Sequence, residues 1–387
     1  GSNFRGMLAS PLNAMTRPLV TLCRQMLSSK VSRASCVRVY QTSARENVPP
    51  AARFGASEFE IWSFNLRTEF KEKDDGPNAW SRRREACANL ISARQPPLIC
   101  LQEATPAMLD YLVAYLGEHR YGWIGTSRSL KFGDEMAAFL YNKRCMDVVA
   151  HQPIWLAPDG VPRGTPGWDA MYPRILETAV FFYSTDGPGG EVKKQEVGML
   201  RVLNTHIDHV GVEARKRSSE VIAKTVADGI LEWPQCVHVV TGDFNNTKND
   251  NECYDILTKG DSGLLDVARQ VELANDIPPF TIHKFEGLKF SSSQGDGTVD
   301  LRPDPKAEKD GQHIDWILYR NNSDLQIKPL KYEVMTNRIP NGPFLSDHFP
   351  ISATFGVERR TSLSNAVWHE SHDQNSTPSD GPIRSNL

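Results

Sequence analysis

Hydrophobic and polar positions in the first third of the chain follow two alternating patterns, one typical of strands and one typical of helices. Phe59–Asn65 alternates as a half-buried strand does, and Leu98–Leu101 is a short, fully apolar run. A helix is expected between them over Trp80–Ala93, because Pro96-Pro97 stops it. A second helix is expected to begin at Thr105-Pro106, where threonine can cap the first turn and proline fits the first helical position.

The remainder of the chain is richer in strand patterns. A long helix is expected over Val212–Leu231, and a loop rich in Gly, Pro and Trp over Trp155–Pro173. Apolar runs of strand length lie at Ala137–Tyr141, Leu176–Tyr183, Leu200–Thr205, Val237–Val240, His313–Tyr319 and Ile351–Phe355. Strands that alternate with helices at first and then dominate the last third indicate an α/β fold, with mixed sheets and helices outside.

Composition divides the chain into three regions. Residues 1–57 precede the first predicted strand, residues 58–357 contain every predicted element, and residues 358–387 are polar, as in disordered tails. Within the central region, Phe290–Gly311 is rich in Ser, Gly, Asp and Lys. We therefore expect an exposed insertion over residues 288–311.

The leader has the composition of an organelle transit peptide. Met7–Arg45 contains Arg and Ser but no acidic residue, and it is weakly amphipathic. Arg38-Val39-Tyr40 resembles the arginine-containing end of a mitochondrial presequence and predicts processing near Gln41. Import into the mitochondrial matrix is therefore expected; a disordered leader on a cytoplasmic protein is the alternative.

Without this leader the chain is acidic. The whole sequence has 44 Lys and Arg against 47 Asp and Glu, and residues 1–45 hold seven of the basic residues and no acidic one. The other residues therefore comprise 37 basic and 47 acidic ones, a net charge of −10. Proteins that bind duplex nucleic acid without sequence preference usually have the opposite balance, so the charge argues against that class.

Cysteine spacing and hydropathy exclude two further classes. The seven cysteines never form a CxxC pair, which argues against a disulfide framework and against a cysteine zinc site. No apolar run approaches the roughly 20 residues that a membrane-spanning helix needs. A hydrophobic content of 40% still allows a substantial core.

The stretch Val239–Asn246 combines a buried strand with reactive side chains. Asp243 and Asn245 alternate with Phe244, so both polar side chains are expected on one side of the strand end. A carboxylate beside an amide could contact a cation, a water molecule and a phosphoryl oxygen. A strand that simply ends in an Asx turn explains the same residues equally well.

Polar residues with similar chemistry stand at the ends of other predicted strands. The set is Asn65, Glu103, His206, Asp243 with Asn245, Asp315, and Asp347-His348. Strand ends in an α/β sandwich meet at a rim where ligands bind. Each residue alone has an ordinary structural explanation, but six strand ends with this chemistry are hard to obtain by chance.

Six short motifs, in this order, resemble the endonuclease/exonuclease/phosphatase superfamily over about residues 58–356. They are Ser63-Phe64-Asn65, Leu101-Gln102-Glu103, Asn204-Thr205-His206, Gly242-Asp243-Phe244-Asn245, His313-Ile314-Asp315 and Ser346-Asp347-His348-Phe349-Pro350. The histidine of Asn-Thr-His-Ile is similar to the nocturnin-like deadenylases, and other stretches are similar to a largely bacterial, poorly characterised branch. The resemblance implies a DNase I-like, four-layered α/β sandwich with two mixed sheets face to face and helices outside.

The resemblance also implies a metal site. Glu103 is expected to be the direct ligand of Mg²⁺, since Mg²⁺ takes few protein carboxylates and keeps water molecules. Asn65 is expected to hold the same ion or a phosphate oxygen, and Asp347 to serve the metal site. Mn²⁺ is a plausible substitute ion.

The remaining strand-end residues are expected to carry the reaction. Asp243 would orient or deprotonate the attacking water, and Asn245 would position it or donate to the phosphoryl group. His348 would contact the phosphate, with Asp315 fixing its tautomer and raising its pKa. His206 is expected to make a second phosphate contact.

Five further residues are candidates for lining the pocket, and four of them have a structural alternative. Glu135 matches an acidic position of the bacterial branch, yet structural use is as good an explanation. Arg174 and Arg215 could contact phosphate or serve as capping or surface residues. Trp168 and His283 could stack on a base or sugar. For the tryptophan, packing of its loop is the stronger alternative.

The expected activity is that of a Mg²⁺-dependent phosphoester hydrolase that attacks phosphorus with an activated water. The resemblance implies a phosphodiesterase, a 3′–5′ exoribonuclease of deadenylase type. A phosphatase for a nucleotide, a dinucleotide such as NADPH or an inositol phosphate is the alternative, and the acidic charge favours it. A catalytically inactive binding domain is a second alternative. Arg128-Ser129-Leu130-Lys131 replaces an acidic, glycine-rich loop expected before Glu135, which bears on substrate choice. No protein partner is evident in the sequence.

Overall fold

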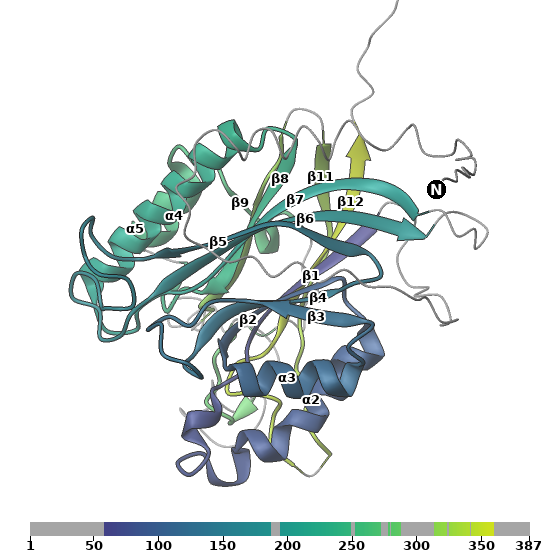
Figure 1. The fold of residues 1–387 in the computed structure, drawn as a ribbon, viewed down its shortest axis with the longest axis vertical. Coiled ribbons are helices and arrows are strands. Elements are labelled where there is room, and N and C mark those ends of the chain that lie inside the picture. The colour runs from purple at the N-terminus through teal and green to yellow at the C-terminus, as the bar shows by residue number, and fades with distance from the viewer. Residues whose placement is uncertain are drawn as a thin grey trace, which may run out of the picture. The chain divides into compact units, whose positions relative to one another are not determined.

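Two sheets of six strands each form the framework of the described part of the chain (Figure 1). The computed structural model describes residues 58–186, 194–248, 252–271, 278, 280–287, 313–322, 325–340 and 342–359. The leader, the expected insertion at 288–311 and residues 360–387 lie outside these ranges, so mitochondrial import and the insertion stay predictions. No helix in the described ranges is long and apolar enough to cross a membrane.

The first sheet has the strand order β11-β12-β1-β2-β4-β3. Only β1 and β2 run parallel; every other neighbouring pair is antiparallel. Its strands are β1 (Glu58–Asn65), β2 (Leu98–Ala104), β3 (Tyr121–Ile124), β4 (Met136–Asn142), β11 (Leu325–Val334) and β12 (Ile351–Arg359).

The second sheet repeats this plan with the order β5-β6-β7-β8-β10-β9. Here β7 and β8 are the parallel pair, and the other neighbours are antiparallel. Its strands are β5 (Met146–Trp155), β6 (Ile175–Asp186), β7 (Lys194–His206), β8 (Cys236–Asp243), β9 (Leu265–Asp266) and β10 (Asp315–Arg320).

A helix connects each parallel pair, because parallel strands need a crossover connection. α2 (Trp80–Arg94) connects β1 to β2, and α4 (Val212–Glu232) connects β7 to β8. The other elements are α3 (Pro106–Leu116), α5 (Glu252–Lys259) and the short 3₁₀ helices η1 (Glu69–Lys71), η2 (Gly76–Asn78) and η3 (Val267–Arg269). The expected cap of α3 is confirmed, since Thr105 accepts a hydrogen bond from the Met108 amide at 3.2 Å.

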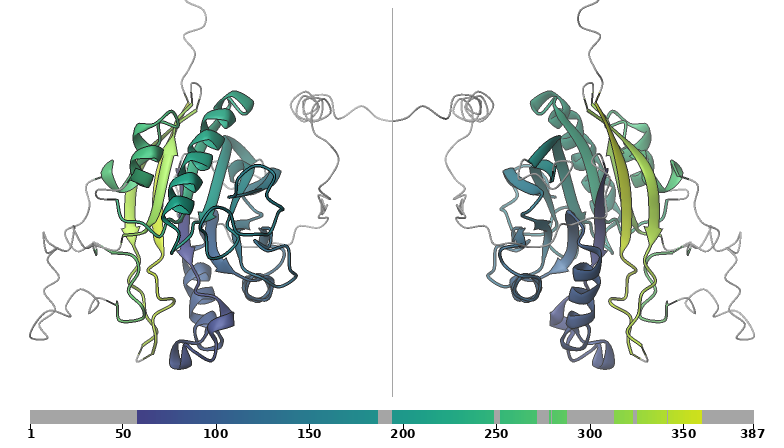
Figure 2. Two further views of the ribbon diagram at one scale, coloured as in Figure 1. Left: turned by 90° about the vertical axis from the view of Figure 1, so that its left-hand side faces the viewer. Right: turned by 90° about the vertical axis from the view of Figure 1, so that its right-hand side faces the viewer.

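Three hydrophobic layers hold the four structural layers together. Side chains such as Ile61 and Val239 pack between the two sheets. A second cluster lies between the first sheet and helices α2 and α3, and a third between the second sheet and helices α4 and α5. Strands inside and helices outside can be followed in Figure 2. The expected four-layered α/β sandwich is thereby confirmed.

All strands and helices expected from the sequence are present, with bounds that shift by a few residues. β8 continues to Asp243 and β2 to Ala104, so Asp243 and Glu103 lie within their strands. The strands and α-helices that the pattern missed are β3, β5, β9, β11 and α5, and the three 3₁₀ helices were not predicted either.

A buried polar bridge joins the two sheets. The Gln102 side chain of β2 donates to Asn204 Oδ1 of β7 at 2.7 Å. Asn204 in turn donates to the carbonyls of Leu101 and Ala138, both at 2.9 Å. Because buried polar groups are costly unless paired, this bridge fixes one sheet against the other close to the strand ends.

Candidate active site

The predicted strand-end residues face the space between the two sheets. Along β8, Val237 and Val239 belong to the layer between the sheets, and Asp243 has the same parity. The same alternation places Asn65, His206 and Asp315 on the inner side of their strands. Four side chains from four strands therefore converge at one rim of the sandwich.

Glu103 reaches the same place by a different route. Alternation along β2 would turn it toward the helices, because Ile99 and Leu101 pack there. The pairing of β2 with β4 shifts between Leu101 and Ala104, and Glu103 has φ of 54°. Non-glycine residues rarely adopt this left-handed conformation. At a β-bulge it changes the direction in which the side chain points. The bulge therefore supplies the carboxylate to the inner side.

Asn65 connects the carboxylates of the two sheets. Its Nδ2 donates to Asp243 Oδ2 at 3.0 Å and to Glu103 Oε1 at 3.3 Å, while its Oδ1 accepts from the Arg67 amide at 2.9 Å. The other oxygen of Glu103 accepts from the Thr68 amide at 3.0 Å. These bonds orient both carboxylates before any ligand arrives.

Asp243 forms an Asx turn and also belongs to the site. Its Oδ1 accepts the Asn245 amide at 2.9 Å, and Asn245 has φ of 46°. The Asn245 side chain donates to the carbonyl of Ile207 at 3.0 Å. Phe244 points the other way and stacks on Trp316, with ring centroids 4.2 Å apart. The Asx turn and the place in the site are therefore compatible explanations of Asp243.

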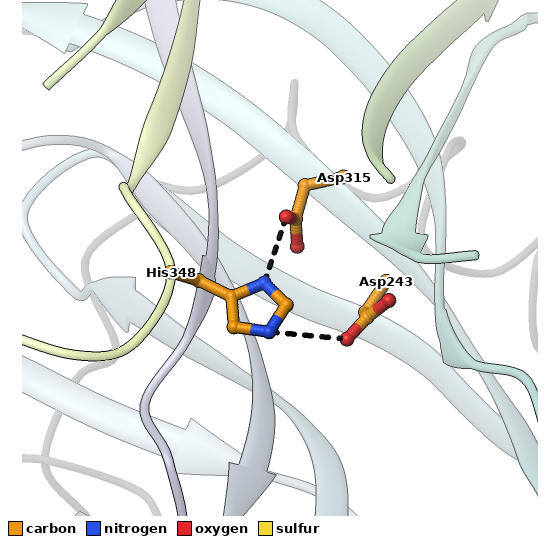
Figure 3. A group of neighbouring side chains, drawn as sticks. All are labelled: Asp243, Asp315 and His348. Carbon is orange, nitrogen blue, oxygen red and sulfur yellow. Dashed lines mark hydrogen bonds and ion pairs between the residues drawn. The ribbon is translucent and has the colours of Figure 1, made fainter. Parts of the chain in front are cut away.

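A histidine joins two of these strand ends (Figure 3). His348 Nδ1 and Asp315 Oδ2 share a hydrogen bond of 2.9 Å, and His348 Nε2 lies 3.8 Å from Asp243 Oδ2. Burial lowers the pKa of His348, but Asp315 and Asp243 outweigh it and raise that pKa to about 10. His348 is therefore an imidazolium at neutral pH, and its Nδ1 proton points at Asp315.

Two further titratable groups, Asp243 and His206, lie beside His348, and their pKa values are shifted in opposite directions. Burial raises the pKa of Asp243 to about 7, with Asp315 adding to the rise and His348 opposing it. His206 Nε2 lies 3.5 Å from Asp243 Oδ2. Burial, together with Arg174 and Arg128, holds the pKa of His206 well below its usual value. His206 is therefore a neutral hydrogen-bonding group.

Asp347 approaches the site from an irregular loop, as sharing a pocket with His348 requires. Its carboxylate accepts from Ser346 Oγ at 3.2 Å and lies 3.4 Å from Arg67 Nη1. Arg67 is also paired with Asp75 at 3.0 Å. Arg67 was not among the predicted site residues; its place two residues after the strand-end Asn65 was the available signal.

A buried arginine of α2 holds the loops that carry these groups. Arg83 donates to the carbonyls of Leu345 at 2.6 Å, Leu66 at 2.9 Å and Arg67 at 3.0 Å, and also to that of Asn78. The Leu345 carbonyl, two residues before Asp347, also accepts from Cys87 Sγ at 3.3 Å. One side chain thus fixes the backbone around both Arg67 and Asp347.

The oxygen donors of Glu103, Asn65 and Asp347 fit a hard divalent cation. Burial raises the pKa of Asp347 and the nearby charge of Glu103 adds to this, although His348, Arg67 and Arg83 oppose it. Carboxylate and amide oxygens at a partly buried site of this kind suit Mg²⁺ or Mn²⁺. Asp243, Asp315 and His348 also have ligand atoms within 4.8 Å of one another. Because His348 Nδ1 is already hydrogen-bonded to Asp315, this group of three residues fits proton transfer better than it fits metal binding.

Two of the lesser candidates lie beside this site. Glu135 Oε2 is 2.8 Å from Arg128 Nη1, and burial, with the charge of Glu103, raises the pKa of Glu135 to about 7. Arg174 pairs with Asp208 at 3.2 Å and donates to the carbonyl of His206 at 3.5 Å. Both therefore border the His206 edge of the site.

The other three have structural contacts. Arg215 donates to the carbonyl of Asp208 at 3.5 Å, and Trp168 packs against the cluster below α4 and α5. His283 is buried against Phe349, and its amide donates to the carbonyl of Asp347 at 2.8 Å. His283 therefore supports the loop of Asp347 from behind.

Comparisons with known proteins agree with this geometry. The model of the endonuclease/exonuclease/phosphatase family matches residues 62–348. An endonuclease/exonuclease/phosphatase from Bacteroides vulgatus is 25% identical, covering 78% of this chain and 100% of that chain, with a TM-score of 0.61. No curated protein matches the sequence.

Two structures with lower identity show the fold alone. A mannosyl-6-phosphatase from Bacteroides thetaiotaomicron is 21% identical, covering 77% of this chain and 99% of that chain, with a TM-score of 0.60. The catalytic domain of human Nocturnin, solved with a bound sulfate anion, is 16% identical, covering 78% and 94% of the two chains, with a TM-score of 0.53.

Proposed function

Because the chain belongs to the endonuclease/exonuclease/phosphatase family, whose members are metal-dependent phosphoester hydrolases, we propose that this rim is its active site and that Mg²⁺ is its metal. The observation that carries the proposal is the hydrogen-bonded pair of His348 and Asp315 beside Asp243, with Glu103 tied to Asp243 through Asn65. A positioned base, a cationic donor and a metal-binding carboxylate are what water attack on phosphorus needs.

Glu103, Asn65 and Asp347 would hold the cation. When bound, Mg²⁺ neutralises charge on a phosphoryl oxygen. Asn65 has a second task that does not depend on the ion, because its amide nitrogen keeps the carboxylates of Glu103 and Asp243 in place. Arg67, between Asp347 and Asp75, keeps Asp347 turned toward the same side.

Asp243 is the proposed general base. With a pKa near neutrality it can accept a proton from water as the new bond between the water oxygen and phosphorus forms and the ester bond breaks. The backbone amide of Asn245 donates to Asp243 Oδ1 and so keeps that carboxylate from rotating. His348 would donate from Nε2 to a phosphoryl oxygen as negative charge grows there, while Asp315 holds its Nδ1 proton. His206 would supply a second, neutral contact.

We propose phosphodiesters of RNA, cleaved from the 3′ end, as the substrate, and a nucleotide-like phosphomonoester as the alternative. The fold likeness to Nocturnin and the deadenylase-like Asn-Thr-His-Ile motif support the first. The fold likeness to a phosphatase and the acidic charge outside the leader support the second. Relative rates on poly(A) RNA, adenosine phosphates and NADPH would decide between them.

Replacing Asp243 tests the mechanism. The purified full-length protein should hydrolyse bis(p-nitrophenyl) phosphate in Mg²⁺, and Asp243→Asn should lower kcat by roughly 100- to 10,000-fold, the usual loss when a general base is removed. EDTA should abolish the activity of the unmodified protein. Asp228→Asn, at an exposed aspartate of α4, is the matched control and should keep full activity. Undiminished hydrolysis in EDTA or in Asp243→Asn would contradict the proposal.

A further inference from the structure

A layer of flat side chains borders the active site at its His206 edge, in which Tyr172 and His209 are exposed and Arg128 is half-buried. Tyr172 and His209 stack their rings with centroids 6.1 Å apart and an interplanar angle of 16°. The guanidinium carbon of Arg128 lies 5.1 Å from the centroid of the Tyr172 ring. We refer to these three residues as the ring platform. None of them is part of the reaction proposed above.

Buried groups fix the His209 side of the ring platform to the active site. Arg174 donates from Nη2 to His209 Nδ1 at 3.0 Å and from Nη1 to the His206 carbonyl at 3.5 Å. Asp208 pairs with Arg174 at 3.2 Å and accepts the amides of Val210 at 3.0 Å and Gly211 at 2.8 Å. The position of His209 relative to His206 is thus set by hydrogen bonds, most of them inside the protein.

The Arg128 side is held as firmly. Arg128 Nη1 is 2.8 Å from Glu135 Oε2, and the carbonyl of Arg128 accepts from Trp155 Nε1 at 2.8 Å. Glu135 in turn lies close enough to Glu103 for the two charges to interact. The ring platform therefore extends from the His206 end of the site toward the proposed metal-binding carboxylate.

Most side chains in and around the ring platform are exposed to solvent and are not packed in the core. Met171 is 54% exposed, Tyr172 43%, Val210 56% and Val212 69%. These residues come from two neighbouring segments, one before β6 and one that leads into the first residue of α4. Asp208 binds both segments through the amides of Met171 and Val210. Exposed apolar and aromatic surface beside a charged site marks a binding region, because nothing in the fold needs it to be there.

We propose that the ring platform binds the nucleobase next to the scissile phosphate, so that the substrate is a nucleotide or nucleic acid and not a sugar phosphate. This inference rests on the proposed function of the neighbouring site. Every base has a π-face, so stacking on aromatic rings with an arginine nearby accepts all four bases. An acidic chain gains little affinity from the phosphate backbone, so ring contacts have to supply the recognition.

Two matched substrate pairs test the inference in the full-length protein with Mg²⁺. One pair is a short RNA with a 3′-terminal adenosine and the same RNA with a 3′-terminal abasic residue. The other is AMP and ribose 5-phosphate. The ratio of kcat/KM for the base-bearing member to that for its partner should favour the base, and Tyr172→Leu should lower that ratio about tenfold through KM. Whichever pair is hydrolysed identifies the kind of nucleotide used.

Two variants control for loss of fold. Tyr172→Phe keeps the ring and should retain the ratio. Tyr115→Leu removes an equally exposed tyrosine, 44% exposed on α3, and should leave both rates unchanged. A ratio that is the same in Tyr172→Leu and in the unmodified protein overturns the inference, and so does an unmodified protein that shows no preference for the base.

Calorimetric binding separates this inference from the proposed function. AMP should bind the full-length protein more tightly than ribose 5-phosphate does, and Tyr172→Leu should remove about tenfold of that difference. This measurement needs no turnover. A protein that hydrolyses none of the four substrates but shows the binding difference contradicts the proposed function alone. Equal binding of both ligands refutes the ring platform as a base-binding surface.

Discussion

His238 is a buried histidine of β8 whose two ring nitrogens have no hydrogen-bond partner among the described residues. In the strand register it lies between Arg201 of β7 and Arg320 of β10. Burial lowers the pKa of His238 to about 3, and the two arginines add to the effect. The folded protein therefore keeps this imidazole neutral far below the pH at which an exposed histidine gains its proton.

Stability should consequently fall in acid. The unfolded chain protonates His238 near pH 6.5 and the folded chain only near pH 3, so the unfolded state binds more protons between these values. By pH 5 this one residue should lower the free energy of unfolding by about 2 kcal/mol. Urea unfolding at pH 7.5 and 5.0 should show a smaller pH effect in His238→Gln. His119→Gln, at an exposed position, should behave as the unmodified protein, and equal pH effects in all three would refute the prediction.

At the residue scale, local sequence located the strand-end residues but not their partners. The orientation of Asp243 could be predicted because strand alternation is a local rule, whereas Asn245 lies beyond the end of β8 with φ of 46° and does not follow it. Tyr172 and His209 could not, since their contact depends on how two loops 37 residues apart lie beside each other. Glu103 was found for its place at the end of an apolar run, although its orientation depends on a bulge that no pattern indicates.

At the element scale, α4 depends on a cap supplied from another loop. Gly211 is at its N-cap position and has no side chain to offer. Asp169 accepts the amide of Ala214 with Oδ1 at 2.7 Å and that of Glu213 with Oδ2 at 3.3 Å. A carboxylate at a helix N-terminus satisfies free amides and opposes the helix dipole. The loop before β6 is thereby attached to the helix that follows the His206 strand.

Removing this cap should destabilise the fold. Asp169→Ala should lower the free energy of unfolding by about 1 kcal/mol, the usual cost of losing an N-cap side chain. Asp169→Asn should keep part of the stabilisation that the cap provides. Urea unfolding measures both. Asp228→Ala is the matched control, since on the same helix Asp228 forms a solvent-exposed pair with Lys224 worth less than about 0.5 kcal/mol. An Asp169→Ala midpoint equal to that of the control would contradict the capping role.

The strands that the sequence pattern missed share a position in the fold. β11 and β3 are the edges of the first sheet, and β5 and β9 are the edges of the second. Edge strands are covered less completely, and most side chains of β5 are half-buried or exposed. Their apolar runs are therefore interrupted, whereas central strands such as β8 are buried throughout and stand out in the sequence.

At the scale of the whole molecule, the sheet order could not be read from the chain. The two sheets share one plan, with a helix-connected parallel pair in the middle and antiparallel strands on both sides. β1 pairs with β12, so the first and last strands of the domain are neighbours. Such long-range pairing leaves no local pattern, although the α/β class and the outer helices were predictable.

This pairing predicts where the domain can be shortened. β12 lies between β11 and β1, and its Ile351, Ala353 and Phe355 are fully buried. A chain of residues 58–359 should unfold cooperatively and keep its Mg²⁺-dependent activity, whereas a chain of residues 58–350 should show neither. Circular dichroism during heating and hydrolysis of bis(p-nitrophenyl) phosphate measure the two properties. Full activity of the shorter chain would show that β12 is dispensable.

The placement of β12 also sets when activity can begin. Synthesis produces Asn65 early and His348 late, and the strand that closes the first sheet is made after both. We therefore expect that a nascent chain without β12 does not assemble the proposed site, because β1 of its central strand pair lacks its neighbour. Chains released prematurely before β12 should be inert for the same reason. From the order of the strands we expect activity to begin only once translation of the domain is complete.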